Sequence, residues 1–474
     1  MTTAAIARPA DPPFTTAALA AFAATAEPSD AARRRAVAAI LDTLAVTIAG
    51  GREPAAERLR AALTPVAAGA GVATFWDGLV LRPEDAALLF GLASHVLDYD
   101  DVSMITVCHP SAPVLSAALS AVPAAGLSGR ALVDAFAVGT EVTIRVGEAM
   151  GFRHYALGFH ATATLGTLGA AAAAARLLGL DATRTGHALA IAASRAGGLR
   201  RNFGSMVKAL HVGFAATEGL RAARLAAVGI EGAAEPFEGE GFLHAFSGGE
   251  TDRWPATVSL GTPFALEHPG FEQKRYPCCY MLHKLIEATL RLWHDAGIGL
   301  DDVARAVVTM PRGGTKPLIH PVPATGLAAL FSGPYAVVAA LADGRIDLAS
   351  FTDAAVARPA LRARLADVTL EEAGPELARG DEIGAAPVTV RLELRDGRRL
   401  AREIVASPGS PQDPLGRDQL AAKWRDCLRR GRPDLDAATA DRLFAAGEDL
   451  LATPRADIWL AALTGTGETT GERR

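Results

Sequence analysis

The chain has 474 residues and a formal net charge of −5 at pH 7; 50% of its residues are hydrophobic and 21% are charged. This composition is typical of a globular protein long enough for two domains, and the lack of a basic excess argues against nucleic-acid binding. No apolar run reaches the roughly 18 residues of a membrane span, and the N-terminal segment lacks the apolar stretch of a secretory signal. The four cysteines fit neither a zinc site nor a disulfide framework. We therefore expect a reduced, cytoplasmic protein with no nucleic-acid or membrane partner.

Residues 30–229 show an almost continuous helical pattern. The first predicted helix, residues 29–50, follows a Ser-Asp cap, repeats apolar residues every three or four positions, and stops at two glycines. Several later segments are small and apolar on nearly all faces, which predicts helices inside an assembly of helices. The further helices are expected within residues 82–101, 111–126, 129–150, 160–180, 183–198 and 209–229.

The pattern changes near Thr262. Strands are predicted within residues 304–311 and 365–372, with a helix over 326–344 between them. A β-hairpin is predicted within residues 386–408, and its Asp396-Gly397 pair favours a type I′ turn. Beyond Pro411 helices return, at residues 418–430 and 436–452, and the polar residues 464–474 predict a disordered tail.

These elements predict a mainly α fold: a large all-helical domain with an inserted, smaller α+β lid domain. The expected boundaries are residues 1–265 for the first part of the helical domain and 266–408 for the lid domain. Residues 409–474 then supply C-terminal helices that complete the helical domain, followed by the tail. A cleft between two such domains is where a ligand is expected.

One short segment, "ASHVLDYDDVSMITVCHP" (residues 93–110), concentrates acidic and imidazole side chains. If its first part ends a helix, His95, Asp98 and Asp101 share a face, and such a face is able to bind Mg²⁺. That arrangement is a weak match to a Mg-dependent all-helical diphosphate enzyme, because the DDxxD order and a second acidic motif are missing. The alternative of a solvated acidic helix end is disfavoured by the helix dipole.

Further polar residues stand beside glycine or proline breaks. His160 follows Gly158 at a predicted helix start, where backbone N–H groups can receive an anion. Lys208 and His211 open another predicted helix, and Lys274 with Arg275 precedes a proline. Combined with the 93–110 segment, these residues predict an acid–base site for a negatively charged substrate.

Lysine is rare in this chain. It supplies only five of the 47 basic residues, and it is the basic residue whose pKa a protein can tune. Lys208 and Lys274 are therefore candidates for the site, whereas Lys316 and Lys423 are expected at ordinary surface positions.

Six segments of the sequence are specific in combination: "HVLDYDD", "HPSAPVL", "GFHATATLGTLGAAAAAARLLGL", "GSMVKALHVGFAA", "KRYPCCYMLH" and "ALFSGPYAVVAAL". Together they make the chain resemble the MmgE/PrpD family, which includes 2-methylcitrate dehydratase, cis-aconitate decarboxylase and iminodisuccinate epimerase. The resemblance spans about residues 30–450 and implies a helical domain with an α+β lid, a homodimer, and no metal or organic cofactor.

The resemblance also implies which residues act. Ammonium groups of the site lysines would stabilise the enediolate that forms when a proton leaves a carbon beside a carboxylate. Asp98 beside His95 and His109 is the candidate acid–base dyad, with His160 as the expected partner on the other face of the substrate; which residue is the base and which the acid stays open. The catalytic residues expected from the family are Asp98, His109, His160, Lys208, Lys274 and Tyr335. The residues expected to bind substrate are Lys208, Lys274, Arg275, His211 and Ser103.

The loop after the DYDD motif departs from the pattern that we expect for decarboxylase-like members. It reads "VSMITVC", with Ser103 and Thr106 but no histidine before His109. This favours a cofactor-independent hydro-lyase resembling 2-methylcitrate dehydratase, acting on a small di- or tricarboxylate of propionate or related carboxylic acid metabolism. An epimerase or a decarboxylase of a similar acid is the alternative, followed by a non-catalytic dimeric binding protein.

Overall fold

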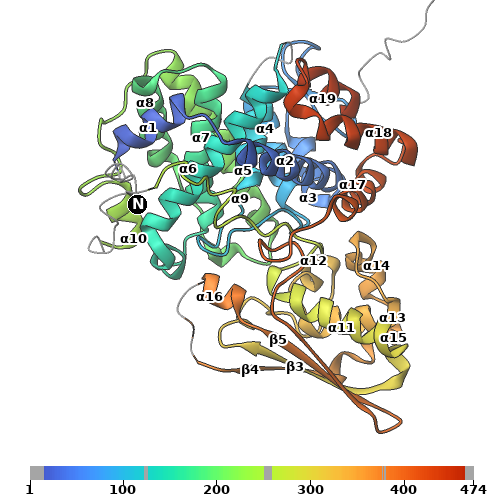
Figure 1. The fold of residues 1–474 in the computed structure, drawn as a ribbon. Coiled ribbons are helices and arrows are strands. Elements are labelled where there is room, and N and C mark those ends of the chain that lie inside the picture. The colour runs from blue at the N-terminus through green and yellow to red at the C-terminus, as the bar shows by residue number, and fades with distance from the viewer. Residues whose placement is uncertain (1–14, 122–125, 250–258, 376, 378–379, 465–474) are drawn as a thin grey trace, which may run out of the picture.

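A computed structural model describes residues 15–121, 126–249, 259–375, 377 and 380–464. The described chain is mainly helical and contains one small mixed sheet, so the predicted fold class is confirmed (Figure 1). Most of the N-terminal and C-terminal helices share one hydrophobic core, and residues 276–404 build a second one. We call these regions the helical part and the α+β part. The predicted disordered tail lies outside the described residues, except for Thr464.

Among the described residues, ten helices of the helical part precede the α+β part. The first long one, α2, begins behind Ser29, whose hydroxyl accepts the N–H of Ala32 as predicted for a cap. The bounds are α1 Thr16–Thr25, α2 Asp30–Gly50, α3 Pro54–Ala62, α4 Pro83–His95, α5 Ser111–Ala121, α6 Gly129–Ala156, α7 Ala161–Leu177, α8 Ala182–Arg195, α9 Met206–Ala227 and α10 Phe242–Ser247. A two-residue hairpin, β1 Val72–Ala73 with β2 Val80–Leu81, precedes α4.

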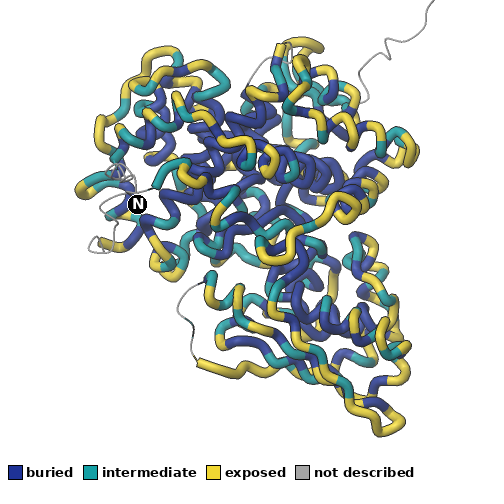
Figure 2. Tube along the Cα trace, in the orientation of Figure 1, coloured by how far each residue is buried: buried dark blue, intermediate teal, exposed yellow. Residues whose placement is uncertain are grey.

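Small residues let the central helices pack closely. Helix α7 is buried from Ala161 to Ala175 and packs against α5, α6, α8 and α9 (Figure 2). Where α4 crosses α9, a Cβ on Gly91 would lie 2.6 Å from the Cα of Gly213, which no side chain tolerates. The glycines therefore permit a close crossing, and the crossing brings one end of α4 near one end of α9.

The α+β part is a four-stranded sheet with helices on one face. The strand order is β4-β3-β5-β6, with β3 and β4 parallel and the other pairs antiparallel. Along β5 buried residues alternate with more exposed ones, because α11 covers one face. The strands are β3 Val303–Pro311, β4 Val368–Ala373, β5 Val388–Leu394 and β6 Arg399–Ile404; the helices are α11 His283–Ala296, α12 Gly326–Ala329, α13 Gly333–Asp343, α14 Asp353–Val356, α15 Pro359–Arg362 and α16 Gly380–Ala385.

Two local predictions in this part are wrong. The hairpin loop has three residues. The N–H of Leu394 donates to the Arg398 carbonyl, the N–H of Gly397 donates to the Leu394 carbonyl, and only Gly397 has a positive φ, of 89°. A type I′ turn needs positive φ at both central residues, so the turn is of another type. The helix expected over residues 326–344 is two helices, because Ser332 is extended and caps α13 with its hydroxyl.

Three C-terminal helices, α17 Arg417–Gly431, α18 Ala437–Glu448 and α19 Ala456–Thr464, return to the helical part, where α17 packs on α2 (Figure 1). Lys423 of α17 is buried, so its expected surface position is wrong. Its ammonium group lies 2.7 Å from Asp42 of α2 and donates to the backbone carbonyls of Tyr99 and Lys274, each at 2.8 Å. One cation thereby connects two helices with two segments of the candidate site.

Within the described residues no helix is long and apolar enough to cross a membrane. All four cysteines are buried and free, as their spacing predicted.

We predict that Lys423→Met lowers the free energy of unfolding by about 3–5 kcal/mol, because it leaves the carboxylate of Asp42 buried without a counter-charge. Urea titration would measure the loss. The double variant Asp42→Asn/Lys423→Met, which removes both charges, is expected to recover part of it; equal losses in the single and double variants would contradict the role of this pair.

Candidate active site

A cavity of about 700 Å³ lies between the two parts. The helical part contributes Asp98, His109, His160 and Lys208 to its wall, and Lys274 comes from the segment that leads into α11. The α+β part closes the other side, through residues 312–319, Phe331 and α16. Five of the residues predicted as catalytic therefore line one cavity.

The site is built where helices end. Helix α4 ends at His95, α7 begins after its cap residue His160, and α9 carries Lys208 and His211 in its first turns. Because the close crossings fix these three ends, their polar side chains converge at the edge of the apolar core. The predicted starts of α7 and α9 are confirmed.

The aspartates do not share a helix face, which corrects that prediction. The helix stops at His95, and Asp98 has a left-handed φ of 48°. Asp101 turns away from the cavity and binds the backbone N–H and hydroxyl of Ser111 at the start of α5. Burial raises the pKa of Asp101 to about 7. Asp101 therefore supports α5 and does not face the cavity.

The Asp98 carboxylate is shared by two ammonium groups. One of its oxygens, Oδ1, accepts from Lys274 Nζ at 2.7 Å and from Lys208 Nζ at 3.1 Å. Lys274 also donates to the Asp98 carbonyl at 2.7 Å. Burial alone would raise the pKa of Asp98, but the two ammonium groups hold it well below its usual range. A carboxylate that is ionised so firmly is a poor base, so within the predicted dyad Asp98 is not the base; it holds the two lysines.

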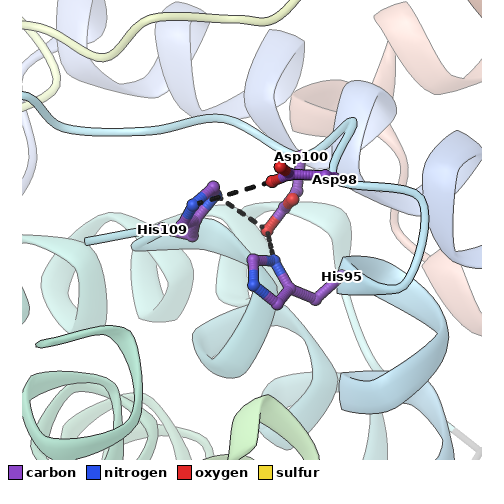
Figure 3. Close-up of side chains that lie close together, drawn as sticks. All are labelled: His95, Asp98, Asp100 and His109. Atoms are coloured by element: carbon purple, nitrogen blue, oxygen red, sulfur yellow. Dashed lines mark hydrogen bonds and ion pairs between the residues drawn. The ribbon is translucent and has the colours of Figure 1, made fainter. Parts of the chain in front are cut away.

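Asp100 lies between two imidazole rings (Figure 3). Its Oδ2 is 2.8 Å from His95 Nδ1 and 3.3 Å from His109 Nδ1. His109 Nε2 points toward Asp98, 4.0 Å from Oδ1. Burial lowers the pKa of both histidines, to about 4 for His95, although Asp100 opposes the shift. In the empty cavity His109 is therefore a neutral imidazole.

His160 stands at another wall of the cavity. Its Nδ1 is 3.0 Å from Nδ1 of His211, and its ring meets the ring of Phe203 edge-on at 5.0 Å. Burial, with Lys208 and the neighbouring histidines, lowers the pKa of His160 well below its ordinary value. The cavity thus presents two neutral imidazoles, and Lys208 is close enough to both to affect their pKa values.

Three other predicted residues do not reach the cavity wall. His211 contacts His160 from behind, which makes it a support and not a substrate contact. Ser103 is buried, and its backbone pairs with Cys108. Arg275 lies next to Lys274 along the chain but extends toward the ring of Tyr276, away from the cavity. The structure therefore does not place Arg275 or Ser103 in the substrate site, contrary to the prediction.

The structure also differs from the prediction that Tyr335 lies in the catalytic site. It is 1% exposed inside the core of the α+β part, and its hydroxyl donates to the carbonyl of Ser350. Phe331, four residues earlier in the sequence and outside α13, is the aromatic residue that lines the cavity from this segment.

Sequence reasoning missed a basic rim. Arg200 stacks over the ring of Tyr155 at 3.8 Å, and both line the cavity with Arg312 and Lys316 of the α+β part. Lys316 is exposed, as expected for a surface lysine, and it also lines the cavity. No local motif singles these residues out, because they converge only through the placement of the two parts.

The loop after the DYDD motif forms an apolar wall. Val102, Met104 and Val107 line the cavity, whereas Thr106 turns its hydroxyl to Cys108. Cys279 is the cysteine on the wall, and burial, with Asp98 nearby, raises the pKa of its thiol to about 11. The thiol is therefore protonated and is a poor nucleophile.

By distance alone, His95, Asp98, Asp100 and His109 are able to surround a metal ion, since one ligand atom from each lies within 4.8 Å of the others. The charged groups around these four residues disfavour metal binding. Lys208 and Lys274 already neutralise Asp98, and a further cation would stand beside two buried ammonium groups. The chemistry of this donor set is that of an anion site.

Fold and cavity together define a class of protein: a helical and an α+β part that enclose a buried acid–base site for an anionic small molecule. A family model for the MmgE/PrpD N-terminal domain matches residues 17–255, and one for the MmgE/PrpD C-terminal domain matches residues 276–445. The chain belongs to the MmgE/PrpD family, lyase-type enzymes that act on carboxylic acids.

Three curated relatives are cis-aconitate decarboxylases or resemble them by name. The cis-aconitate decarboxylase of Homo sapiens is 31% identical over 359 residues, 73% of this chain and 72% of the relative. That of Aspergillus terreus is 28% identical over 423 residues, 84% and 85% of the two chains. A cis-aconitate decarboxylase-like protein, oryM, of Aspergillus oryzae is 28% identical over 416 residues, 83% and 85%. These relatives favour the decarboxylase alternative over the dehydratase.

We predict that overnight dialysis against EDTA leaves turnover of the carboxylic acid substrate unchanged, because ammonium groups and not a metal ion balance the Asp98 charge. Activity would be measured before and after dialysis, and again after adding Mg²⁺ or Zn²⁺. A loss of activity that either metal restores would contradict the electrostatic argument.

Proposed function

We propose that this protein decarboxylates cis-aconitate or a closely similar unsaturated tricarboxylate. The observation that carries the proposal is the pairing of two buried ammonium groups with two neutral imidazoles on the wall of one cavity. Similarity to cis-aconitate decarboxylases over about three quarters of the chain supports the choice of reaction.

The cavity is positive in a chain that is negative overall. Five cationic side chains line it, whereas the carboxylates on its wall are those of Asp98 and Glu372. If histidines are counted as neutral, the wall residues carry a formal net charge of 5 − 2 = +3. The whole chain carries −5. A trianion is therefore drawn toward this cavity and away from the rest of the surface. The cations are Lys208, Lys274, Arg200, Arg312 and Lys316.

The residues fit the electron flow of such a decarboxylation. The carbon–carbon bond to one carboxylate breaks, and carbon dioxide leaves. The electron pair moves through the double bond to the carbon beside another carboxylate, whose growing charge Lys208 and Lys274 stabilise. A proton then adds to that carbon. The sum is one trianion and one proton giving one dianion and carbon dioxide.

In this mechanism the imidazole that donates the proton becomes a charged imidazolium when substrate binds. In the empty cavity His109 and His160 are neutral, because burial lowers their pKa values. Three carboxylates beside the rings add the opposite electrostatic effect and raise both pKa values. Substrate binding therefore protonates an imidazole of the site, and the reaction then consumes that proton.

A second candidate is the dehydration of a hydroxy tricarboxylate that carries an alkyl group, such as 2-methylcitrate. The apolar wall of Val102, Met104 and Val107 favours it, because this wall offers contacts to a methyl group and no polar partner to a hydroxyl or carboxylate. The homodimer expected from the family resemblance stays a prediction.

The test is turnover of cis-aconitate, citrate, 2-methylcitrate and iminodisuccinate, followed by NMR in D₂O. We expect carbon dioxide and a product with one new carbon-bound deuterium from cis-aconitate. His160→Gln and Lys208→Met are expected to lower turnover at least about a hundredfold, while His294→Gln, at a surface histidine, has no effect. Turnover of 2-methylcitrate alone would select the second candidate, and inertness toward all four acids would refute both.

We also predict that binding of tricarballylate, a saturated tricarboxylate that cannot lose carbon dioxide in this way, takes up protons near pH 7. The reason is the rise in the pKa values of His109 and His160 next to the bound charges. An indicator dye in weak buffer measures the uptake, which should fall in His160→Gln. Binding with no uptake, or with proton release, would contradict neutral imidazoles in the empty site.

A further inference from the structure

The substrate cavity is larger than a six-carbon tricarboxylate. Its volume is about 700 Å³, whereas such an acid takes the place of about six water molecules, or roughly 200 Å³ at about 30 Å³ each. Cavities that enclose a small ligand normally cover most of its surface. A tricarboxylate bound at Lys208 and Lys274 would therefore leave most of this cavity unfilled.

An apolar part of the wall begins close to the ammonium groups along the chain. The segment that carries Lys274 reaches the cavity wall again at Met281. A buried cluster joins this segment to the loop that follows Asp98. The cluster consists of Val102, Met104 and Tyr280, with Met281 packed against it, and all four residues line the cavity.

Helix α16 covers this apolar part from the other domain. A Cβ on Gly380 would lie 2.5 Å from a methyl group of Val107, and one on Gly384 would lie 3.0 Å from the Cγ of Met104. Ile383 of the same helix is half-buried and lines the cavity. Because the glycine contacts leave no room even for a methyl group, α16 cannot fill the space by moving closer to the loop.

The loop offers this space no free backbone donor at three successive residues. The N–H of Val102 donates to the Glu272 carbonyl at 3.0 Å, and that of Ser103 to the Cys108 carbonyl at 2.8 Å. The N–H of Met104 donates to the carboxylate of Glu272 at 3.2 Å. A carboxylate placed here would lose its water without gaining these donors, whereas a hydrocarbon chain needs none.

We propose that the substrate carries an alkyl chain longer than methyl, which lies against this apolar wall while the carboxylates bind at the lysines. The inference rests on the proposed function and narrows its substrate class to alkyl-substituted tricarboxylates. We call this part of the cavity the alkyl subsite; its residues are Val102, Met104, Val107, Tyr280, Met281 and Ile383.

The alkyl subsite makes a quantitative expectation. Moving one methylene group from water into an apolar site contributes about 0.8 kcal/mol, which is a nearly fourfold change in Kd. Three methylene groups, the difference between a methyl and a butyl substituent, should therefore change Kd about fiftyfold.

The test is binding of tricarballylate and of its methyl and butyl derivatives, with the alkyl group on a terminal carbon of the three-carbon chain. All three acids are saturated and cannot lose carbon dioxide by the proposed route, so calorimetry measures Kd alone. We expect the butyl derivative to bind about fiftyfold more tightly than the methyl derivative. A gain smaller than about fourfold, the contribution of a single methylene, would overturn the alkyl subsite.

Two variants locate the chain. Ile383→Asn and Met281→Gln each place an amide in the alkyl subsite, while Ile458→Asn places one on the exposed surface of α19 as the matched control. The ratio of the methyl to the butyl Kd should fall at least about fivefold in the first two variants and stay unchanged in the control. The ratio cancels any general loss of tricarboxylate binding, and thermal melting shows that each variant is folded. An unchanged ratio in both subsite variants would place the chain elsewhere and overturn the inference.

The two proposals fail in different ways. If the wild type turns over cis-aconitate but binds the methyl and butyl derivatives equally, the alkyl subsite is overturned and the proposed function stands. If the folded wild type binds none of the three saturated acids and is inert toward all four acids of the turnover assay, the proposed function is overturned and the alkyl subsite with it.

Discussion

The buried carboxylate of Asp98, shared by two lysine ammonium groups, is the interaction on which the rest of the site depends. Removing three charged groups from water is costly, and the cost is offset only when each charge has close partners of the right geometry. Asp98 meets this condition with 2.7 and 3.1 Å contacts to Lys274 and Lys208. Asp100 supplies a second buried negative charge close to Lys274, so the buried groups are balanced without ligand, and the cationic surplus of the cavity comes from Arg200, Arg312 and Lys316. The arrangement is thus stable without ligand and still attractive to a polycarboxylate.

The surrounding helices make this arrangement possible by ending in the right place. Glycine and alanine let α4, α7 and α9 cross closely, so their ends meet beside an apolar core and not in solvent. Apolar surroundings favour the neutral form of an imidazole, which is why His109 and His160 are uncharged until an anion arrives. Lys423 of α17 then fixes the backbones of Tyr99 and Lys274 from outside. The C-terminal helices therefore stabilise a site to which they contribute no wall residue.

Sequence patterns predicted the fold class and the five cavity residues because those signals are local: apolar periodicity, and polar residues beside glycine or proline breaks. These patterns did not predict features that depend on the direction of a side chain or on contacts between segments far apart in the sequence. Lys274 and Arg275 are neighbours in a segment that bends at Arg275, and only Lys274 reaches the cavity. Tyr335 lies in a segment that does reach the site, but at a position that faces the core. Lys423 contacts groups far away along the chain, which no local pattern reveals.

The loop after Asp98 departs from the expected family pattern, and its conformation shows why this departure affects the shape of the cavity. Asp98 and Val107 are the non-glycine residues with positive φ in the described chain, at 48° and 51°. For a β-branched residue this conformation is strained, and it persists only where the surroundings impose it. Here Val102 pairs with Glu272 on one side, and Val107 packs against Gly380 of α16, where a Cβ would lie 2.5 Å from its methyl group. The loop is held by both parts of the molecule, so its apolar residues are fixed elements of the cavity wall. A substrate must accommodate that wall, because the wall cannot move without releasing both contacts.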